Sequence, residues 1–229
     1  YNAGFNIIGP YVGLVFAAMA TDYYPRLSSV AHNNQQARVL INQQAEVALL
    51  ILAPILTVFM VFINWVVILL YSTKFVPING MFHWAALGMY FKAASWSIAF
   101  IFLAKGASKL FFWNELITNI YLLGFNILGY KLGGLEGLGF SFLATYVVYF
   151  VQVYIIAKIK YHFLFNKEII KIMAIQIALG VACFLAVKFT PKIMAYGLGS
   201  VIILASGLYS LMELNKKLDL KSIFARFKN

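Results

Sequence analysis

The chain has 229 residues, of which 63% are hydrophobic and only 11% are charged, with a net charge of +11. This composition does not fit a water-facing surface. It also lacks the polarity of a disordered chain, the paired cysteines of a disulfide scaffold and the heptads of a coiled coil. We therefore predict an all-α polytopic membrane protein, built as a bundle of transmembrane helices.

The excess of Lys and Arg over Asp and Glu does not indicate a nucleic-acid partner. The 18 Lys and Arg residues stand mostly singly between long apolar runs, as they do in the loops of membrane proteins. No basic stretch alternates with aromatic residues on a polar surface, as a nucleic-acid site would require. The lone cysteine, Cys183, lies inside an apolar run, so we expect it to be buried as a small apolar residue.

Seven charge-poor runs are long enough to cross a membrane, because a bilayer core about 30 Å thick needs roughly 20 residues of helix. They cover residues 1–21, 47–71, 80–104, 111–130, 137–157, 169–187 and 193–212. The first run starts at Tyr1 without an initiator Met, so we expect the chain to be a fragment that lacks an upstream part.

The first span has a polar face that includes Asn6, and Pro10 is expected to bend its helix. Residues 22–46, which follow it, are rich in Asn and Gln yet hold several aliphatic side chains. This pattern predicts a cytoplasmic, partly amphipathic helix that lies at the membrane surface. Asp22 and Arg26 lie where the first span ends, so they are candidates for a gate; a plain contact at a helix end is the alternative.

Lys92 is the one charged residue near the centre of a predicted span. A lysine there costs at least about 2.5 kcal/mol unless it pairs, meets water or reaches the interface. We interpret Lys92, with Ser95 on the same face of the helix, as a candidate for lining a substrate path. The alternative is an internal ion pair with Glu115 or with a residue outside this chain.

The fourth and fifth spans carry polar stripes at helical spacing. Asn119 and Asn126 share a face with Glu115 and are candidates for the same path. Glu115 is also a candidate for a protonatable group that couples to an ion gradient, the alternative being stabilisation by the positive end of the helix dipole. The spacing of Gly129 and Gly133 fits close helix packing as well.

The last two spans contain few polar residues, so we predict that residues 161–212 form a peripheral pair of helices. Basic residues divide unequally between the two sides of this arrangement, with thirteen on one side. The positive-inside rule makes that richer side cytoplasmic, and it places the basic tail, residues 213–229, in the cytoplasm. The poorer side holds only four: Lys74, Lys131, Lys188 and Lys192.

The sequence contains no P-loop, GxSxG, HExxH or helix-opening GxGxxG motif, and no pair of ligand side chains has metal-binding spacing. We therefore expect no enzymatic activity, no cofactor and no metal site. A membrane polysaccharide polymerase or acyltransferase is the enzymatic alternative, and it would need His, Asp or Arg residues grouped in a cavity or a large loop.

Two short stretches resemble a known family. Residues 18–28 read AMATDYYPRLS, and residues 103–109 read LAKGASK, followed by Asn114 and Glu115. Together with the topology, these stretches resemble the C-terminal half of bacterial O-antigen and polysaccharide flippases, which belong to the MOP transporter superfamily together with the MATE transporters.

The resemblance implies two pseudo-symmetric helical lobes around a central cavity. Residues 1–160 would form the second lobe, with residues 161–212 as peripheral helices. The implied function is alternating-access transport of a polyprenyl-pyrophosphate-linked oligosaccharide across the bacterial inner membrane. The candidate role of Glu115 adds the expectation of coupling to an H⁺ or Na⁺ gradient. The implied partners are this lipid-linked oligosaccharide, membrane lipids and other polysaccharide assembly proteins. A multidrug or cation antiporter of the same superfamily is the alternative transporter.

Overall fold

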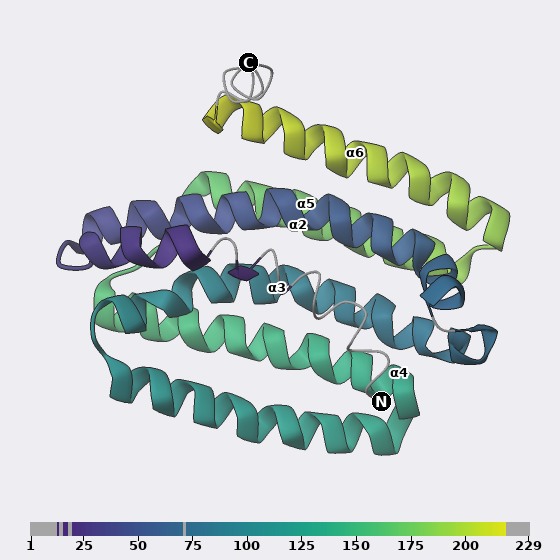
Figure 1. Cartoon of the computed structure of the whole chain (residues 1–229), viewed down its shortest axis with the longest axis horizontal. Helices are drawn as coiled ribbons and strands as arrows, with labels where there is room; N and C mark the ends of the chain where they lie inside the picture. Colours follow the sequence, from purple (N-terminus) through teal and green to yellow (C-terminus); the bar gives the residue numbers. More distant parts are fainter. Residues whose placement is uncertain (1–12, 14–15, 18–19, 71, 219–229) are drawn as a thin grey trace.

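The computed structural model describes residues 13, 16–17, 20–70 and 72–218, which form a bundle of helices (Figure 1). No strand occurs in these residues, so the all-α prediction is confirmed. A short helical segment covers residues 20–29. The elements that follow are α2 (Asn34–Leu70), η1 (Thr73–Ile78), α3 (Asn79–Ala104), α4 (Ser108–Tyr161), α5 (Lys167–Phe189) and α6 (Lys192–Leu218).

Five helical stretches in the described residues are long and apolar enough to cross a membrane. One of them, α4, holds both the fourth and the fifth predicted spans, because the chain folds back at Gly134 (Figure 1). Gly134 has a φ of 57° and a ψ of −133°, a backbone conformation that only glycine adopts without strain. Most of the first predicted span lies outside the described residues.

Residues 22–46 do not form a separate helix as predicted. The helical segment ends at residue 29, a turn follows, and α2 then runs without a break from Asn34 into the second predicted span. The side chain of Asn33 caps α2 by accepting hydrogen bonds from the backbone N–H groups of Gln35 (2.9 Å) and Gln36 (3.2 Å). Because Ile41 is fully buried, this first part of α2 already packs inside the bundle.

The long helix α2 lies at the centre of the bundle. On one side it packs against α3, which in turn packs against α4, and on the other side it packs against α5 and α6 (Figure 1). The main core joins buried side chains of α2 such as Leu52, Leu56 and Met60 to Phe82 and Met89 of α3. The helices α5 and α6 therefore pack mainly on α2, and α6 lies at the outer edge.

Glycine allows the two halves of α4 to approach closely. A Cβ atom on Gly137 would lie 1.9 Å from the carbonyl oxygen of Gly129, so neither position admits a side chain without movement of the backbone. The predicted close packing therefore occurs at Gly129, but its partner is Gly137. A Cβ atom on Gly133, which shares the predicted motif, would meet nothing within 4 Å.

The helix directions place the described members of the two predicted sets of basic residues at opposite ends of the bundle, whereas the predicted tail from residue 219 onward lies outside the described residues. The start of α2, the end of α3, both ends of α4 and the start of α5 lie at one end (Figure 1). We call this the basic end, because Arg38, Lys105, Lys109 and Lys158 lie there. The smaller set falls at the opposite end, on η1, near Gly134 and at the α5–α6 connection.

Candidate functional site

A cavity of about 290 Å³ lies between α3 and the two halves of α4. It collects four of the predicted site residues, Lys92 and Ser95 from α3 and Glu115 and Asn119 from the first half of α4. Aromatic rings form much of its wall. The lining residues are Lys92, Ser95, Trp96, Ala99, Phe100, Leu103, Phe111, Glu115, Thr118, Asn119, Leu122, Tyr146 and Tyr149.

Lys92 is half-buried, and its ammonium group lies over aromatic rings of the second half of α4. The Nζ atom is 5.0 Å from the ring centroid of Tyr146 and 5.8 Å from that of Phe142. In the described part of the chain Lys92 forms no salt bridge, so the predicted alternative of an ion pair with Glu115 is not formed. Ring faces stabilise a cation only partly, so the charge stays available to an anion in the cavity.

Glu115 faces the cavity from the first half of α4. Its Oε1 atom accepts hydrogen bonds from the Tyr149 hydroxyl (2.6 Å) and from Nδ2 of Asn114 (3.0 Å). The helix-dipole explanation for Glu115 is wrong, because α4 begins at Ser108 and has no acidic residue in its first turn, where that effect acts. The carboxylate is instead held by a phenol from the opposite half of the hairpin.

Ser95 and Asn119 also line the cavity, each with a hydrogen bond to its own helix. Ser95 is buried, and its hydroxyl donates to the carbonyl of Lys92 (3.0 Å). Asn119 is exposed, and its Nδ2 donates to the carbonyl of Glu115 (2.8 Å). The amide oxygen of Asn119 is the acceptor that this side chain can offer to a bound molecule.

A second polar network holds the two halves of α4 together beside the cavity. The amide of Gln152 donates to Oδ1 of Asn114 at 2.8 Å, and the hydroxyl of Thr118 donates to the carbonyl of Asn114 at 2.7 Å. The polar stripes predicted on the fourth and fifth spans therefore face each other. Part of their polarity serves helix packing inside the hairpin.

No protein-family model, curated protein or solved structure matches this chain. Each of the two stretches that carry the family resemblance contacts a neighbouring part of the bundle. Tyr23 in the first is buried and donates its hydroxyl to the carbonyl of Ser97 (2.6 Å). Lys105 in the second donates to the carbonyl of Ala31, just beyond the first stretch, and lies over the ring of Tyr161.

The other predicted site residues lie away from the cavity. Asn126 lines a separate pocket near Gly134, and Asn6 lies outside the described residues. Asp22 and Arg26 form an exposed ion pair of 2.9 Å within one helical turn. This geometry matches the predicted alternative of a plain helix contact, and a gate role for the pair stays a prediction.

Sequence reasoning missed a polar cluster at the basic end. Glu46 of α2 is 1% exposed, and it pairs with Lys217 of α6 and accepts a hydrogen bond from Nδ2 of Asn166 (3.1 Å). Asn166 in turn caps α5, and its backbone N–H donates to Oδ1 of Asn42 (2.9 Å). The signal that could have revealed the cluster is the spacing of Asn42 and Glu46, which lie four apart on one face of α2.

The last two helices also carry a polar contact that the prediction of few polar residues overlooked. Gln176 of α5 is fully buried, and it binds the hydroxyls of Ser206 and Ser210 of α6, each at 2.8 Å.

Within the described ranges, no group of three His, Cys, Asp or Glu side chains is placed to hold a metal ion.

Proposed function

We propose that this chain is part of a transporter that moves a polyprenyl-pyrophosphate-linked oligosaccharide from the cytoplasmic to the outer leaflet of a bacterial inner membrane by alternating access. The carrying observation is the aromatic-lined cavity in which Lys92 lies outside any ion pair of the described residues. The protein acts without covalent chemistry, and its C-terminus lies in the cytoplasm.

The chemistry of such a substrate matches the cavity. A pyrophosphate must lose water to enter a low-dielectric region, and a cation there offsets that cost. Lys92 supplies this charge, and the Asn119 amide can bond sugar hydroxyls. Ring faces such as that of Trp96 give the apolar surface that binding sites commonly present beside a few polar groups.

Glu115 supplies a means of coupling transport to a gradient. As a carboxylate it accepts the Tyr149 hydroxyl, and this bond joins the two halves of α4 across the cavity. Protonation removes the negative charge and weakens that bond, because charge-assisted hydrogen bonds are the stronger kind. A proton on Glu115 therefore loosens the hairpin on one side of the cavity, which is a local change of the type that alternating access needs.

An antiporter for drugs or other cations is the second candidate, and Glu115 in an aromatic cavity favours it, because organic cations bind carboxylates and ring faces. Lys92 argues against it, since a like charge in the same cavity repels a cationic substrate. A polymerase or acyltransferase is less consistent with this site, because the cavity lining includes neither His nor Arg.

Glycan display in a strain deleted for the gene tests the proposal. The measurement compares the surface polysaccharide ladder with the pool of lipid-linked repeat units in each leaflet, and the intact gene serves as the control. We expect loss of the ladder, with complete repeat units accumulating on the cytoplasmic side. Units that reach the outer leaflet but stay unpolymerised would identify a polymerase, and a normal ladder with altered drug resistance would identify an antiporter.

A further inference from the structure

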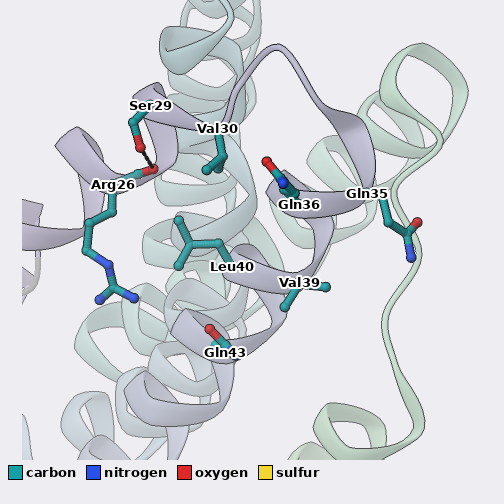
Figure 2. A pocket seen from close by; sticks show the side chains of 8 residues that line it. All are labelled: Arg26, Ser29, Val30, Gln35, Gln36, Val39, Leu40 and Gln43. Atoms are coloured by element: carbon teal, nitrogen blue, oxygen red, sulfur yellow. Dashed lines mark hydrogen bonds between the residues drawn. The ribbon is translucent and has the colours of Figure 1, made fainter.

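A groove lies at the basic end between the helical segment 20–29 and the start of α2 (Figure 2). It shares no lining residue with the cavity that contains Lys92. It consists of two adjoining pockets of about 430 and 310 Å³, which share Arg26, Leu40 and Gln43. The segment that forms it, residues 22–46, is the one whose mixture of amides and aliphatic residues the transport proposal does not use.

The middle of the groove is an apolar surface that remains exposed. Val30, Val39 and Leu40 line its middle, and Val39 is 49% exposed (Figure 2). These residues precede the second predicted span, which begins at residue 47, so we expect them at the level of the lipid headgroups rather than in the hydrocarbon core. An exposed apolar surface at this depth fits a ligand that is itself partly apolar.

Hydrogen-bond donors of Arg and Gln side chains surround this apolar surface. Arg26 extends from the helical segment toward the end of the groove where Gln43 lies, and Gln35 and Gln36 lie near the turn (Figure 2). Gln44 lines the adjoining pocket, and its buried Nε2 atom has no hydrogen-bond partner among the described residues. Guanidinium and amide N–H groups together match the oxygens of a phosphate diester.

Two cations line the groove, Arg26 and Lys217; each is paired with a carboxylate, and Arg26 is the more exposed of the two. One of the Arg26 nitrogens, NH1, binds Asp22, which leaves the other N–H groups of the guanidinium for a ligand. Lys217 lines the adjoining pocket but is paired with Glu46. The surrounding basic end attracts anions as a whole, and the cytoplasmic leaflet of a membrane presents anionic lipids to such a surface.

We propose that the groove binds one anionic glycerophospholipid, with its phosphate at Arg26 and Gln43 and the start of an acyl chain along Val30, Val39 and Leu40. The bound lipid holds the helical segment against α2 and thereby fixes the basic end in the membrane. This site is independent of the transport cavity, so neither proposal depends on the other.

Native mass spectrometry of the full chain, purified in mild detergent and titrated with phosphatidylglycerol, tests the site. We expect Arg26→Gln to weaken binding of the first lipid about tenfold, the effect of losing one charge-assisted contact. The matched control is Lys109→Gln, which removes the same charge from an exposed position at the same end but outside the groove, and which leaves the first binding step unchanged. Val39→Glu places a carboxylate in the groove and abolishes that step.

Three outcomes would overturn the proposal. Equal losses in the Arg26 and Lys109 variants would show only the general attraction of a basic surface. Equal binding of zwitterionic phosphatidylcholine would remove the anionic headgroup from the recognition. Displacement of the lipid by inorganic phosphate at a similar concentration would identify a site for a free anion, because a lipid site also uses the apolar surface. If Val39→Glu does not fold, the Arg26 variant decides, since that side chain is exposed and outside the core.

Discussion

Polar side chains lie between helices in two regions of the bundle, and the regions differ in whether those side chains find hydrogen-bond partners. Between α5 and α6, the amide nitrogen and oxygen of Gln176 each bind a serine hydroxyl, so its polar atoms are satisfied. Between α3 and α4, the Lys92 ammonium contacts ring faces but no acceptor that is described, and it opens into a cavity. A satisfied group packs helices together, whereas a charge that is only partly satisfied requires another partner.

The difference has an energetic basis. Hydrogen bonds between membrane helices contribute about 0.6 kcal/mol each on average, so the α5–α6 contact acts as a modest stabiliser. A lysine in the middle of a span costs about 2.5 kcal/mol or more, and ring faces return only part of that cost. The comparison therefore predicts that variants at Lys92 change transport, whereas variants at Gln176 change stability.

The largest effect is expected for Lys92→Ala. Removing the cation from the cavity lowers transport about a hundredfold, because an anionic substrate then enters without an opposite charge. Lys92→Arg retains part of the activity, since it keeps the charge and can still lie over the Tyr146 ring. The surface glycan ladder at matched expression measures both variants. A normal ladder with Lys92→Ala would remove Lys92 from the mechanism.

A smaller effect is expected for Glu115→Gln. The glutamine amide carries no negative charge, so it mimics the protonated carboxyl: its bond to the Tyr149 hydroxyl is permanently the weaker kind, and the group no longer takes up a proton. Coupling free energies of 1–3 kcal/mol correspond to changes of about 5- to 150-fold, and we expect transport to fall about tenfold. The matched variant Tyr149→Phe keeps the carboxylate and removes its partner. Transport by Glu115→Gln that still responds fully to the proton gradient would assign the coupling to another residue.

A change in stability alone is expected for Gln176→Leu. The variant loses two hydrogen bonds to α6 and leaves the hydroxyls of Ser206 and Ser210 without their partner, at a cost of about 1–2 kcal/mol. The thermal unfolding midpoint in detergent measures this loss. Lys92→Ala serves as the reciprocal control, because removing a charge that the ring faces stabilise only partly should not lower the midpoint. A transport defect in Gln176→Leu at permissive temperature would break the comparison between the two regions.

Hydropathy predicted the helices well, because length and apolar content decide whether a segment can span a membrane. The single-residue reversal at Gly134 was not predicted, because several nearby glycines fit a longer loop equally well. The polar face around Glu115 followed from helical periodicity. Periodicity did not predict that this face packs against Tyr149 and Gln152 of the second half of α4, because the rotation of one helix against another depends on packing that one sequence does not reveal.

The errors near the basic end have a related cause. Residues 22–46 are polar enough to predict a surface helix, but Asn42 and Glu46 are satisfied by Asn166 and Lys217, which are more than a hundred residues away. These distant partners allow a polar segment to be buried at the start of α2. The sequence showed which groups required partners, and the fold determined which of them found partners.

The smallest effect on stability is expected for Asp22→Ala. An exposed ion pair between residues four apart on a helix contributes only about 0.3–0.5 kcal/mol, so the unfolding midpoint should hardly move. Glycan display then distinguishes the two interpretations of this pair. Unchanged transport supports a plain helix contact, whereas a clear loss at normal stability supports a gate. The control is Glu213→Ala, which breaks the ion pair with Lys216 within one turn of α6, where Glu213 is more buried than Asp22. A loss confined to Asp22→Ala would extend the functional region from the cavity to the basic end.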